Sequence, residues 1–544
     1  MDFVNIDNFL RKQKFCLLYA KILLLVLAAC YSFSQLFFGL DYTDSFYYLD
    51  IFKSDEVEWM IVGFQVLGKL WINCFGDSLI ALRIGNWLFY ALYFTLAYVW
   101  FVPKQSRERF VGFLSLPFML LPTFSLNIFN GDSCTLLMCI CISKLLVDWM
   151  FNYSKKVVLM LFVVTLLTLL FRFPNIVSLP ITIVVVLLFQ KNKRKWFEYL
   201  AVCFCVLIVY FVIAGLFKDG NLIKDGNLIP NEGGHSLKNL LTNYLHDGKI
   251  ILKYIPVCLL LIIISCAKIQ RFYVRIFVDV LFSLFFGVYL FYNVEFGFAN
   301  WNISLLLSSL LISLYIYLIF RCFDGIDVDK FSNGGAVMII LMLMSLVNPA
   351  GSDTGFLKLI WVLLSTIPFL AYNIEKIVQS KLFVVTISAC VLICLYGHYR
   401  NPFGEQSLNN LKYRIDNRQL AGIRTSNDYF RVYENLKNDI HCYNAENIVI
   451  YGERSHGLCE LLNIEKRFHS SFFMNPDDES EVEIMEDYIK KYSPVIFFMP
   501  YHPFGAKEIF EWRDNLTKME TMMFSNGYKD KKKSDYYIVY EIEK

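Results

Sequence analysis

The stretch KILLLVLAACYSFSQLFFGLDYTDSFYYLD (21–50) decides what kind of fold this sequence adopts. It begins with an apolar run that is long enough to cross a bilayer, and three carboxylates, Asp41, Asp44 and Asp50, follow at once. The run is longer than the core of a typical signal peptide, and no convincing small-residue cleavage site follows it. We therefore expect a retained membrane span with acidic groups at its end.

The rest of the chain repeats this apolar pattern. Of its 544 residues, 56% are hydrophobic and 18% are charged, whereas about a quarter are charged in a typical soluble protein. The net charge of +3 is a sum of nearly balanced opposites, which argues against nucleic acid as a partner. About thirteen apolar segments predict an integral membrane protein: 16–38, 81–102, 111–129, 134–150, 157–171, 175–190, 197–217, 251–267, 276–292, 302–320, 336–348, 357–373 and 382–397.

Short loops predict the orientation in the membrane. Alternate loops are rich in Lys and Arg, which places them and the N-terminus in the cytoplasm. These basic loops are 103–110, 191–196, 267–275 and 373–381. The loops at 130–134, 293–301 and 348–356 contain no Lys or Arg and are expected outside. The first loop and the C-terminus are then also outside.

The composition divides the chain into a membrane domain of all-α class (1–397) and an extracytoplasmic domain (398–544). In the second domain three apolar runs predict strands and two stretches with helical spacing predict helices, which suggests a small α/β layer. The strands are expected at 447–452, 494–501 and 535–542, and the helices at 477–492 and 506–527. Spacing alone leaves open whether Cys442 and Cys459 form a disulfide.

Two outer loops of the membrane domain are long. The first (39–80) mixes apolar and charged residues at helical intervals, which predicts amphipathic helices on the membrane surface. The second (218–250) contains the tandem copy KDGNLIKDGNLI (218–229), which we interpret as a duplication tolerated in a mobile loop.

Cations and acids gather at the outer ends of the apolar segments. Arg83, Arg172 and Lys253 lie on the side where Lys and Arg are usually sparse. Each could extend toward lipid headgroups, but three cations beside acidic loops also suit a phosphate group. Asp44 and Asp132 stand at expected helix starts, where a carboxylate could cap the helix, hold a metal or position a substrate.

The first loop motif DYTDSFYYL (41–49), the second loop motif NGDSCTLLM (130–138), the many spans and the outer C-terminal domain together resemble the GT-C superfamily. These integral membrane glycosyltransferases use polyprenyl-phosphate-linked sugars and include protein O-mannosyltransferases and the lipid A aminoarabinose transferase. The resemblance covers the whole chain in topology, while the motifs that carry it are short.

The resemblance implies roles for individual residues. The acid of the first outer loop is the catalytic base of the family, which points to Asp44 with Asp41 in reserve. Ser45 replaces the Glu that often follows this acid, and the pair at 55–56 fits the dipeptide better but lies farther from the span. Tyr47, Tyr48 and Asp132 are expected to position the substrate.

Two further segments, RFPNIVSLP (172–180) and NPAGSDTGF (348–356), look similar to outer-face segments of bacterial members. Ser352 and Asp353 are therefore expected to contact substrate, although an ordinary Gly-rich turn explains them equally. The same likeness suggests a bacterial inner membrane.

The expected reaction is the inverting transfer of a hexose or pentose from a polyprenyl phosphate to a lipid, glycan or protein. It needs a base for the acceptor hydroxyl and positive charge for the departing phosphate, supplied by Arg83, Arg172 and Lys253 or by Mg²⁺ or Mn²⁺ shared by Asp44 and Asp132. A transporter or flippase of lipid-linked saccharides, or a polymerase of such saccharides, is the alternative.

Overall fold

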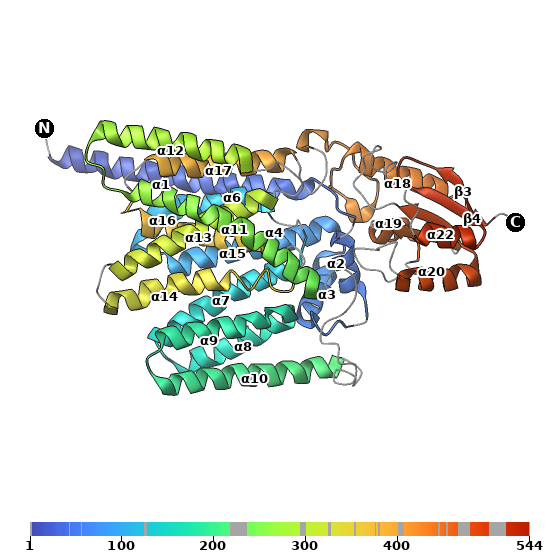
Figure 1. The fold of residues 1–544 in the computed structure, drawn as a ribbon, viewed down its shortest axis with the longest axis horizontal. Helices are drawn as coiled ribbons and strands as arrows, with labels where there is room; N and C mark the ends of the chain where they lie inside the picture. Colours follow the sequence, from blue (N-terminus) through green and yellow to red (C-terminus); the bar gives the residue numbers. More distant parts are fainter. Residues whose placement is uncertain are drawn as a thin grey trace.

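The structure is a computed structural model in which a body of long helices carries a small sheet domain at one end (Figure 1). It describes residues 3–42, 44–55, 57–124, 128–217, 237–293, 301–324, 328–352, 355–375, 377–378, 381–400, 407–443, 447–452, 455–465, 479–499 and 518–542.

Helices occupy all thirteen apolar segments expected from the sequence. A backbone in lipid has no water to bond to, so an apolar segment there satisfies its own N–H and C=O groups as a helix. The helices of the body are α1 (Phe3–Ser34), α4 (Leu79–Phe101), α5 (Arg107–Phe110), α6 (Ser115–Phe124), α7 (Gly131–Phe151), α8 (Lys155–Phe171), α9 (Ser178–Phe189), α10 (Lys193–Phe217), α11 (Leu237–Cys266), α12 (Phe272–Asn293), α13 (Trp301–Asp324), α14 (Val328–Met344), α15 (Leu359–Ser365), α16 (Ile367–Ile374) and α17 (Lys381–Arg400).

Fewer helices than thirteen are long and apolar enough to cross a membrane. Among the described residues six helices meet this requirement, and seven do if α15 and α16, which meet at 62°, count as one broken span. These helices make the chain an integral membrane protein. The count of thirteen spans stays a prediction, because segments such as α9 (12 residues) are too short to span by themselves.

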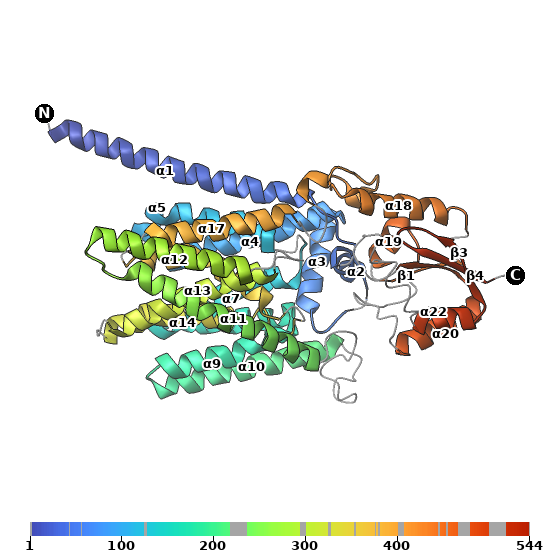
Figure 2. The same ribbon diagram turned by 45° about the horizontal axis from the view of Figure 1, so that its top comes forward.

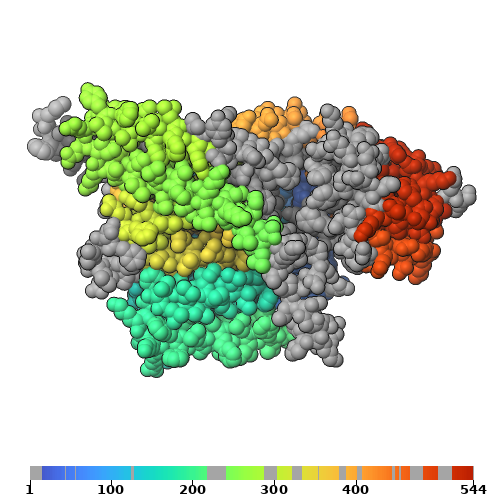
Figure 3. Space-filling view, in the orientation of Figure 1, coloured from blue at the N-terminus to red at the C-terminus, as the bar shows by residue number. Residues whose placement is uncertain are grey.

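Apolar side chains lie on the outer surface of the helical body and also fill its core. On α12, which lies on the surface in Figure 3, Tyr273 is 83% exposed and Phe277 is 66% exposed. Such a surface suits lipid. Inside the body, Tyr93, Leu305 and Ile360 belong to one continuous buried cluster that joins α4, α13 and α15.

The first loop folds into helices, as expected from the sequence, namely α2 (Asp44–Lys53) and α3 (Val62–Phe75). They lie between the helical body and the sheet domain in Figure 2. The rings of Phe64 on α3 and Phe52 on α2 lie 5.6 and 6.1 Å from the ring of Phe129, just before α7. The first loop therefore packs over the start of α7.

The second long loop is shorter than expected. Residues 237–250, which were assigned to it from the sequence, form the first turns of α11. Their polar residues recur among apolar ones at helical spacing, so the helix continues past its apolar part. The tandem repeat lies outside the described residues.

The C-terminal domain contains a sheet of mixed direction. Its described strands are ordered β1-β2-β4-β3, with β1 parallel to β2 and the other pairs antiparallel. They are β1 (Ile448–Gly452), β2 (Val495–Met499), β3 (Tyr528–Lys533) and β4 (Ile538–Ile542), with helices α18 (Asn427–Ile440), α19 (Ser455–Leu462), α20 (Glu479–Tyr492) and α22 (Lys518–Ser525).

Most elements of this domain agree with the sequence analysis. β1, β2, β4 and α20 confirm four expected elements, and α22 confirms the described part of the fifth. The edge strand β3 was missed because its sequence, YKDKKK, has only one apolar residue. Cys442 is exposed and Cys459 is buried, and both are thiols.

The C-terminal domain packs on the first loop. The ring of Tyr42 stacks on that of Tyr429 at 5.3 Å, and the Tyr42 hydroxyl donates to the Tyr429 carbonyl at 3.0 Å. The Gly457 N–H donates to the Tyr42 carbonyl at 3.1 Å, and a Cβ on Gly457 would come within 2.6 Å of the Phe46 ring. Only glycine allows α19 to approach α2 so closely.

Candidate active site

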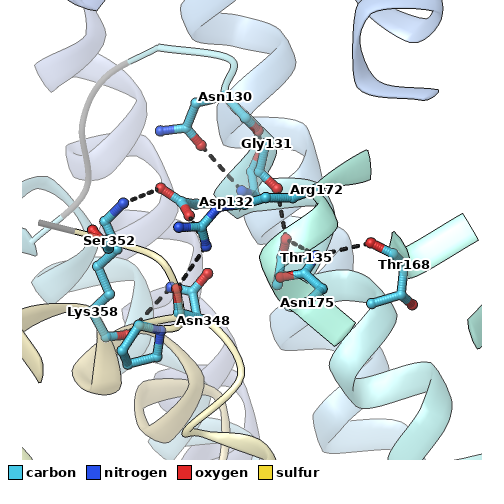
Figure 4. Close-up of polar contacts among 12 residues, drawn as sticks. Asn130, Gly131, Asp132, Thr135, Thr168, Arg172, Asn175, Asn348, Ser352 and Lys358 are labelled. Carbon is cyan, nitrogen blue, oxygen red and sulfur yellow. Dashed lines mark hydrogen bonds and ion pairs between the residues drawn. The ribbon is translucent and has the colours of Figure 1, made fainter. Parts of the chain in front are cut away.

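A buried carboxylate stands in the first turn of α7, at the end of the body that the first loop covers. This residue, Asp132, does not cap the helix, since the Asn130 side chain accepts from the Ser133 N–H at 3.1 Å. The Asp132 carboxylate instead points to two cations from other parts of the chain (Figure 4). Capping, one of the roles considered for Asp132 from the sequence, is therefore performed by Asn130.

The two cations are Arg172 and Lys358. Arg172 Nη1 lies 3.2 Å from Asp132 Oδ1, and Lys358 Nζ lies 2.8 Å from Asp132 Oδ2. The side chain of Asp132 is 4% exposed and those of the two cations are each 13% exposed. We call these three residues the Asp132 cluster. It holds two positive charges against one negative charge where little water screens them.

Arg172 is held by the turn in which it lies. It ends α8 in an extended conformation, with φ −164° and ψ 115°, and its Nη1 also donates to the Asn348 carbonyl at 2.8 Å. Three residues later, Asn175 Nδ2 donates to Thr135 Oγ1 on α7 at 2.8 Å and to the Thr168 carbonyl at 2.9 Å. These bonds tie the turn after α8 to α7, which keeps Arg172 beside Asp132.

Lys358 is the member of the cluster that the sequence analysis missed. It ends the short helix η6 (Gly355–Lys358), and its Nζ lies 5.7 Å from the centre of the Trp361 ring. The sequence could have indicated Lys358, because it lies near the start of an apolar segment, as Arg83 and Lys253 do. Asn348 was also missed, and it joins both cations, since its Nδ2 donates to the Lys358 carbonyl at 3.4 Å.

Arg83, one of the three expected phosphate ligands, binds backbone carbonyls of its own chain. Its Nη1 donates to the carbonyls of Leu36 and Phe38 at 2.8 and 3.3 Å, and its Nη2 donates to that of Gly39 at 2.7 Å. Arg83 is only 2% exposed. The structure thus uses its guanidinium to hold the chain where α1 passes into the first loop, where backbone carbonyls lack helical partners.

Lys253, the third expected phosphate ligand, is exposed on α11. It therefore differs from Arg172 and Lys358, whose side chains are only 13% exposed in the Asp132 cluster.

The acids of the first loop lie at the start of α2. Asp41 Oδ2 accepts from the Ser45 N–H at 2.9 Å, so Asp41 caps this helix. Asp44 is the first residue of α2, and its side chain lies outside the described residues. Asp50 pairs with His456 of the C-terminal domain.

Apart from Asp132, the expected substrate-positioning residues lie on α2 and in the segment after α14. Tyr47 and Tyr48 are partly buried on α2, and the Tyr48 ring lies 5.7 Å from that of Phe64. Ser352 is 3% exposed, and its N–H donates to the Tyr244 hydroxyl at 3.3 Å. Asp353 lies outside the described residues.

The side chain of Asp44, one of the two ligands expected for a metal, lies outside the described residues, and the other ligand, Asp132, lies between two cations. Each of its two oxygens is within ion-pair distance of a protein cation, so a divalent ion there would meet two like charges. Within the described part of the chain, no three His, Cys, Asp or Glu side chains are grouped so that they could hold a metal.

No family model and no curated protein matches this sequence. Among solved structures, ArnT from Cupriavidus metallidurans, in the apo state and bound to undecaprenyl phosphate, is similar at 10% identity and a TM-score of 0.40, over 95% of this chain and 97% of that one. The oligosaccharyltransferase AglB from Archaeoglobus fulgidus, in complex with an inhibitory peptide and a dolichol-phosphate, is similar at 13% identity and a TM-score of 0.41, over 88% and 69% of the two chains.

Both TM-scores lie below 0.5, so these similarities do not assign a family to this chain. At such low identity they assign no reaction to this chain, whose chemistry has to come from its own residues.

Proposed function

We propose that this protein is a membrane glycosyltransferase that moves a sugar from a polyprenyl-phosphate-linked donor to an acceptor. The Asp132 cluster carries the proposal, because it keeps two cations and one carboxylate buried at the covered end of a membrane-embedded helical body. A lipid phosphate brings negative charge to that depth and offsets the excess positive charge.

The phosphate contacts are assigned to Arg172 and Lys358. A sugar on a lipid phosphate already has a good leaving group, so the reaction needs positive charge on that group more than a strong general acid. Asp132 holds the two cations side by side in this assignment. Its charge leaves one positive charge of the three residues uncompensated, which a phosphate monoanion would match.

The role of the base is assigned to Asp44. Asp41 is assigned a supporting role, because it caps the start of α2, the helix that begins with Asp44. Asp44 belongs to the first loop, which packs over the start of α7. A base there would take the proton of the acceptor hydroxyl, whose oxygen attacks the sugar carbon on the side opposite the phosphate. The C–O bond to the phosphate then breaks, and the anomeric centre is inverted.

The acceptor is proposed to enter between the first loop and the C-terminal domain, with Tyr47, Tyr48, Ser352 and Asp353 as contacts. Support comes from the packing of the C-terminal domain on α2, the helix that begins with Asp44. The acceptor is a lipid, a glycan or a protein, and this whole end is proposed to lie outside a bacterial inner membrane, with the N-terminus in the cytoplasm.

The base is tested by Asp44→Asn in detergent-purified protein given a polyprenyl-phosphate sugar and an acceptor. We expect transfer to fall at least 100-fold, as for removal of a general base, with the unfolding temperature unchanged. Asp55→Asn is the matched control, because Asp55 is a fully exposed acid of the same loop. Full activity of Asp44→Asn, or an equal loss in Asp55→Asn, would exclude Asp44 as the base.

The same assay separates an enzyme from a transporter or flippase, because detergent leaves no closed compartment. Transfer of one sugar per acceptor, rather than chain growth, separates it from a polymerase. Since the positive charge is assigned to protein cations, transfer is expected to continue in EDTA, and loss of activity that Mg²⁺ or Mn²⁺ restores would instead assign that charge to a metal.

A further inference from the structure

Side chains of α11 form hydrogen bonds with the backbone of the segment that carries Lys358. This segment, of which residues 348–352 and 355–358 are described, reaches the Asp132 cluster through Lys358 at its end. Near its start, the Tyr244 hydroxyl on α11 donates to the Pro349 carbonyl at 2.5 Å and accepts from the Ser352 N–H at 3.3 Å. One turn along α11, Asp247 Oδ2 accepts from the Phe356 N–H at 2.8 Å, two residues before Lys358.

Asp247 is an unusual residue to find at this place. It is 1% exposed, and burying a carboxylate is costly unless bonds to its oxygens offset the loss of water. Its Oδ2 bonds to the Phe356 N–H, and His246 Nδ1 lies 3.3 Å from its Oδ1. The carboxylate therefore holds the backbone of η6 at Phe356 instead of facing solvent.

Two glycines let the 348–358 segment lie this close to its neighbours. Gly355 has φ +55°, and a Cβ there would come within 2.4 Å of Asp247 Oδ2. Gly351 has φ +68°, and a Cβ there would come within 2.5 Å of Pro174 Cβ, two residues after Arg172. The segment is thus held between α11 on one side and the turn that carries Arg172 on the other.

We infer that Asp247 is a positioning residue that sets the place of the Lys358 ammonium relative to Arg172, so that α11 fixes the spacing of the two cations. The inference rests on the proposed function for the claim that this spacing serves a phosphate. Asp247 itself does not touch the phosphate. It acts through the Phe356 N–H and the short helix that ends in Lys358.

The test measures binding of a polyprenyl phosphate without sugar to the full-length protein in detergent. We expect Asp247→Ala to weaken binding about tenfold, because η6 loses the bond that places Lys358. Asp247→Asn should bind nearly as well as the wild type, since its amide oxygen can still accept from the Phe356 N–H. Asp279→Ala is the matched control and should have no effect, because the Asp279 carboxylate pairs with Arg275, at 3.0 Å.

A double-mutant cycle shows whether Asp247 acts through Lys358. Once Lys358→Met has removed the ammonium, adding Asp247→Ala should weaken binding little further. Losses that multiply would mean that Asp247 acts elsewhere, and wild-type binding by Asp247→Ala would likewise overturn the inference.

Hydrogen exchange of the amides of 355–358 separates this inference from the proposed function. Asp247→Ala should speed this exchange and Asp247→Asn should not, whether or not any lipid binds. If the wild type binds no polyprenyl phosphate, the proposed function fails while faster exchange still supports the positioning. Unchanged exchange in Asp247→Ala would overturn the positioning itself.

Discussion

Two groups of acids and cations join distant parts of this chain, and they differ in burial. The Asp132 cluster has side chains that are 4 to 13% exposed. The second group links the first loop to the C-terminal domain, where Lys53 Nζ lies 3.0 Å from Asp77 and 2.7 Å from Glu460, and Arg418 lies 3.4 Å from Asp77. We call it the docking group, and its side chains are 19 to 89% exposed.

The same residue types therefore have different consequences in the two places. The docking group has two acids and two cations near water, and such pairs contribute about 0–1 kcal/mol each. The domain contact depends more on the buried Phe46, Tyr42 and Leu458. The Asp132 cluster has one more positive than negative charge and little exposed surface. Each of its charges therefore depends strongly on the others, and an anion could pair with the excess positive charge.

The largest expected effect comes from removing the carboxylate of the buried group. Asp132→Asn leaves Arg172 and Lys358 facing each other without a counter-charge, which should cost about 3–5 kcal/mol of stability and end transfer. Thermal unfolding in detergent measures it. A loss below about 1 kcal/mol would mean that the buried and exposed groups do not differ as described.

A cation of the buried group should affect binding more than stability. Lys358→Met keeps the apolar stem and leaves a neutral Asp132–Arg172 pair, so unfolding should change little while polyprenyl phosphate binding weakens about 100-fold. Lys253→Met is the comparison, because Lys253 is an exposed cation on α11. Equal losses in the two variants would make Lys253 a phosphate ligand, as first expected from the sequence.

The smallest effect is expected in the docking group, and it should depend on pH. Burial alone would raise the pKa of Asp77, but the hydrogen bond and charge of Lys53 outweigh it and hold that pKa below its usual range. Ionised Asp77 thus stabilises the folded state above about pH 4, and this contribution disappears as pH falls through the lowered pKa.

Asp77→Asn should therefore lower stability by up to about 1 kcal/mol at pH 7, and by progressively less as pH falls from about 4 through the lowered pKa. Unfolding of both proteins across this range measures the difference. A difference that grows toward low pH would have the wrong sign for a lowered pKa.

Much of the architecture could be predicted from local patterns. Apolar segments predicted where the body's helices lie, and shorter apolar runs predicted three of the strands, because both patterns reflect burial along a short piece of chain. β3 was missed because only its first residue, Tyr528, is buried, so its sequence contains no apolar run. The first turns of α11 were missed because their polar residues are typical of a loop, and the sequence does not show the surface on which these turns pack.

The candidate site was predicted in part. Asp132 and Arg172 were singled out and lie together, whereas Arg83 was singled out and holds backbone carbonyls instead. Local sequence shows that a charge stands at the end of a helix and not what that charge faces.

The sequence by itself determined the class of this protein and the end of the body where its polar groups gather. A helix that crosses a bilayer is a property of about 20 neighbouring residues, so it can be read without any contact. Only the tertiary structure decided that Asp132, Arg172 and Lys358 share one largely buried place, and that Asp247 bonds to the short helix that ends in Lys358. These residues are far apart along the chain, and packing of α7, α8, η6 and α11 is what brings their charges within bonding distance.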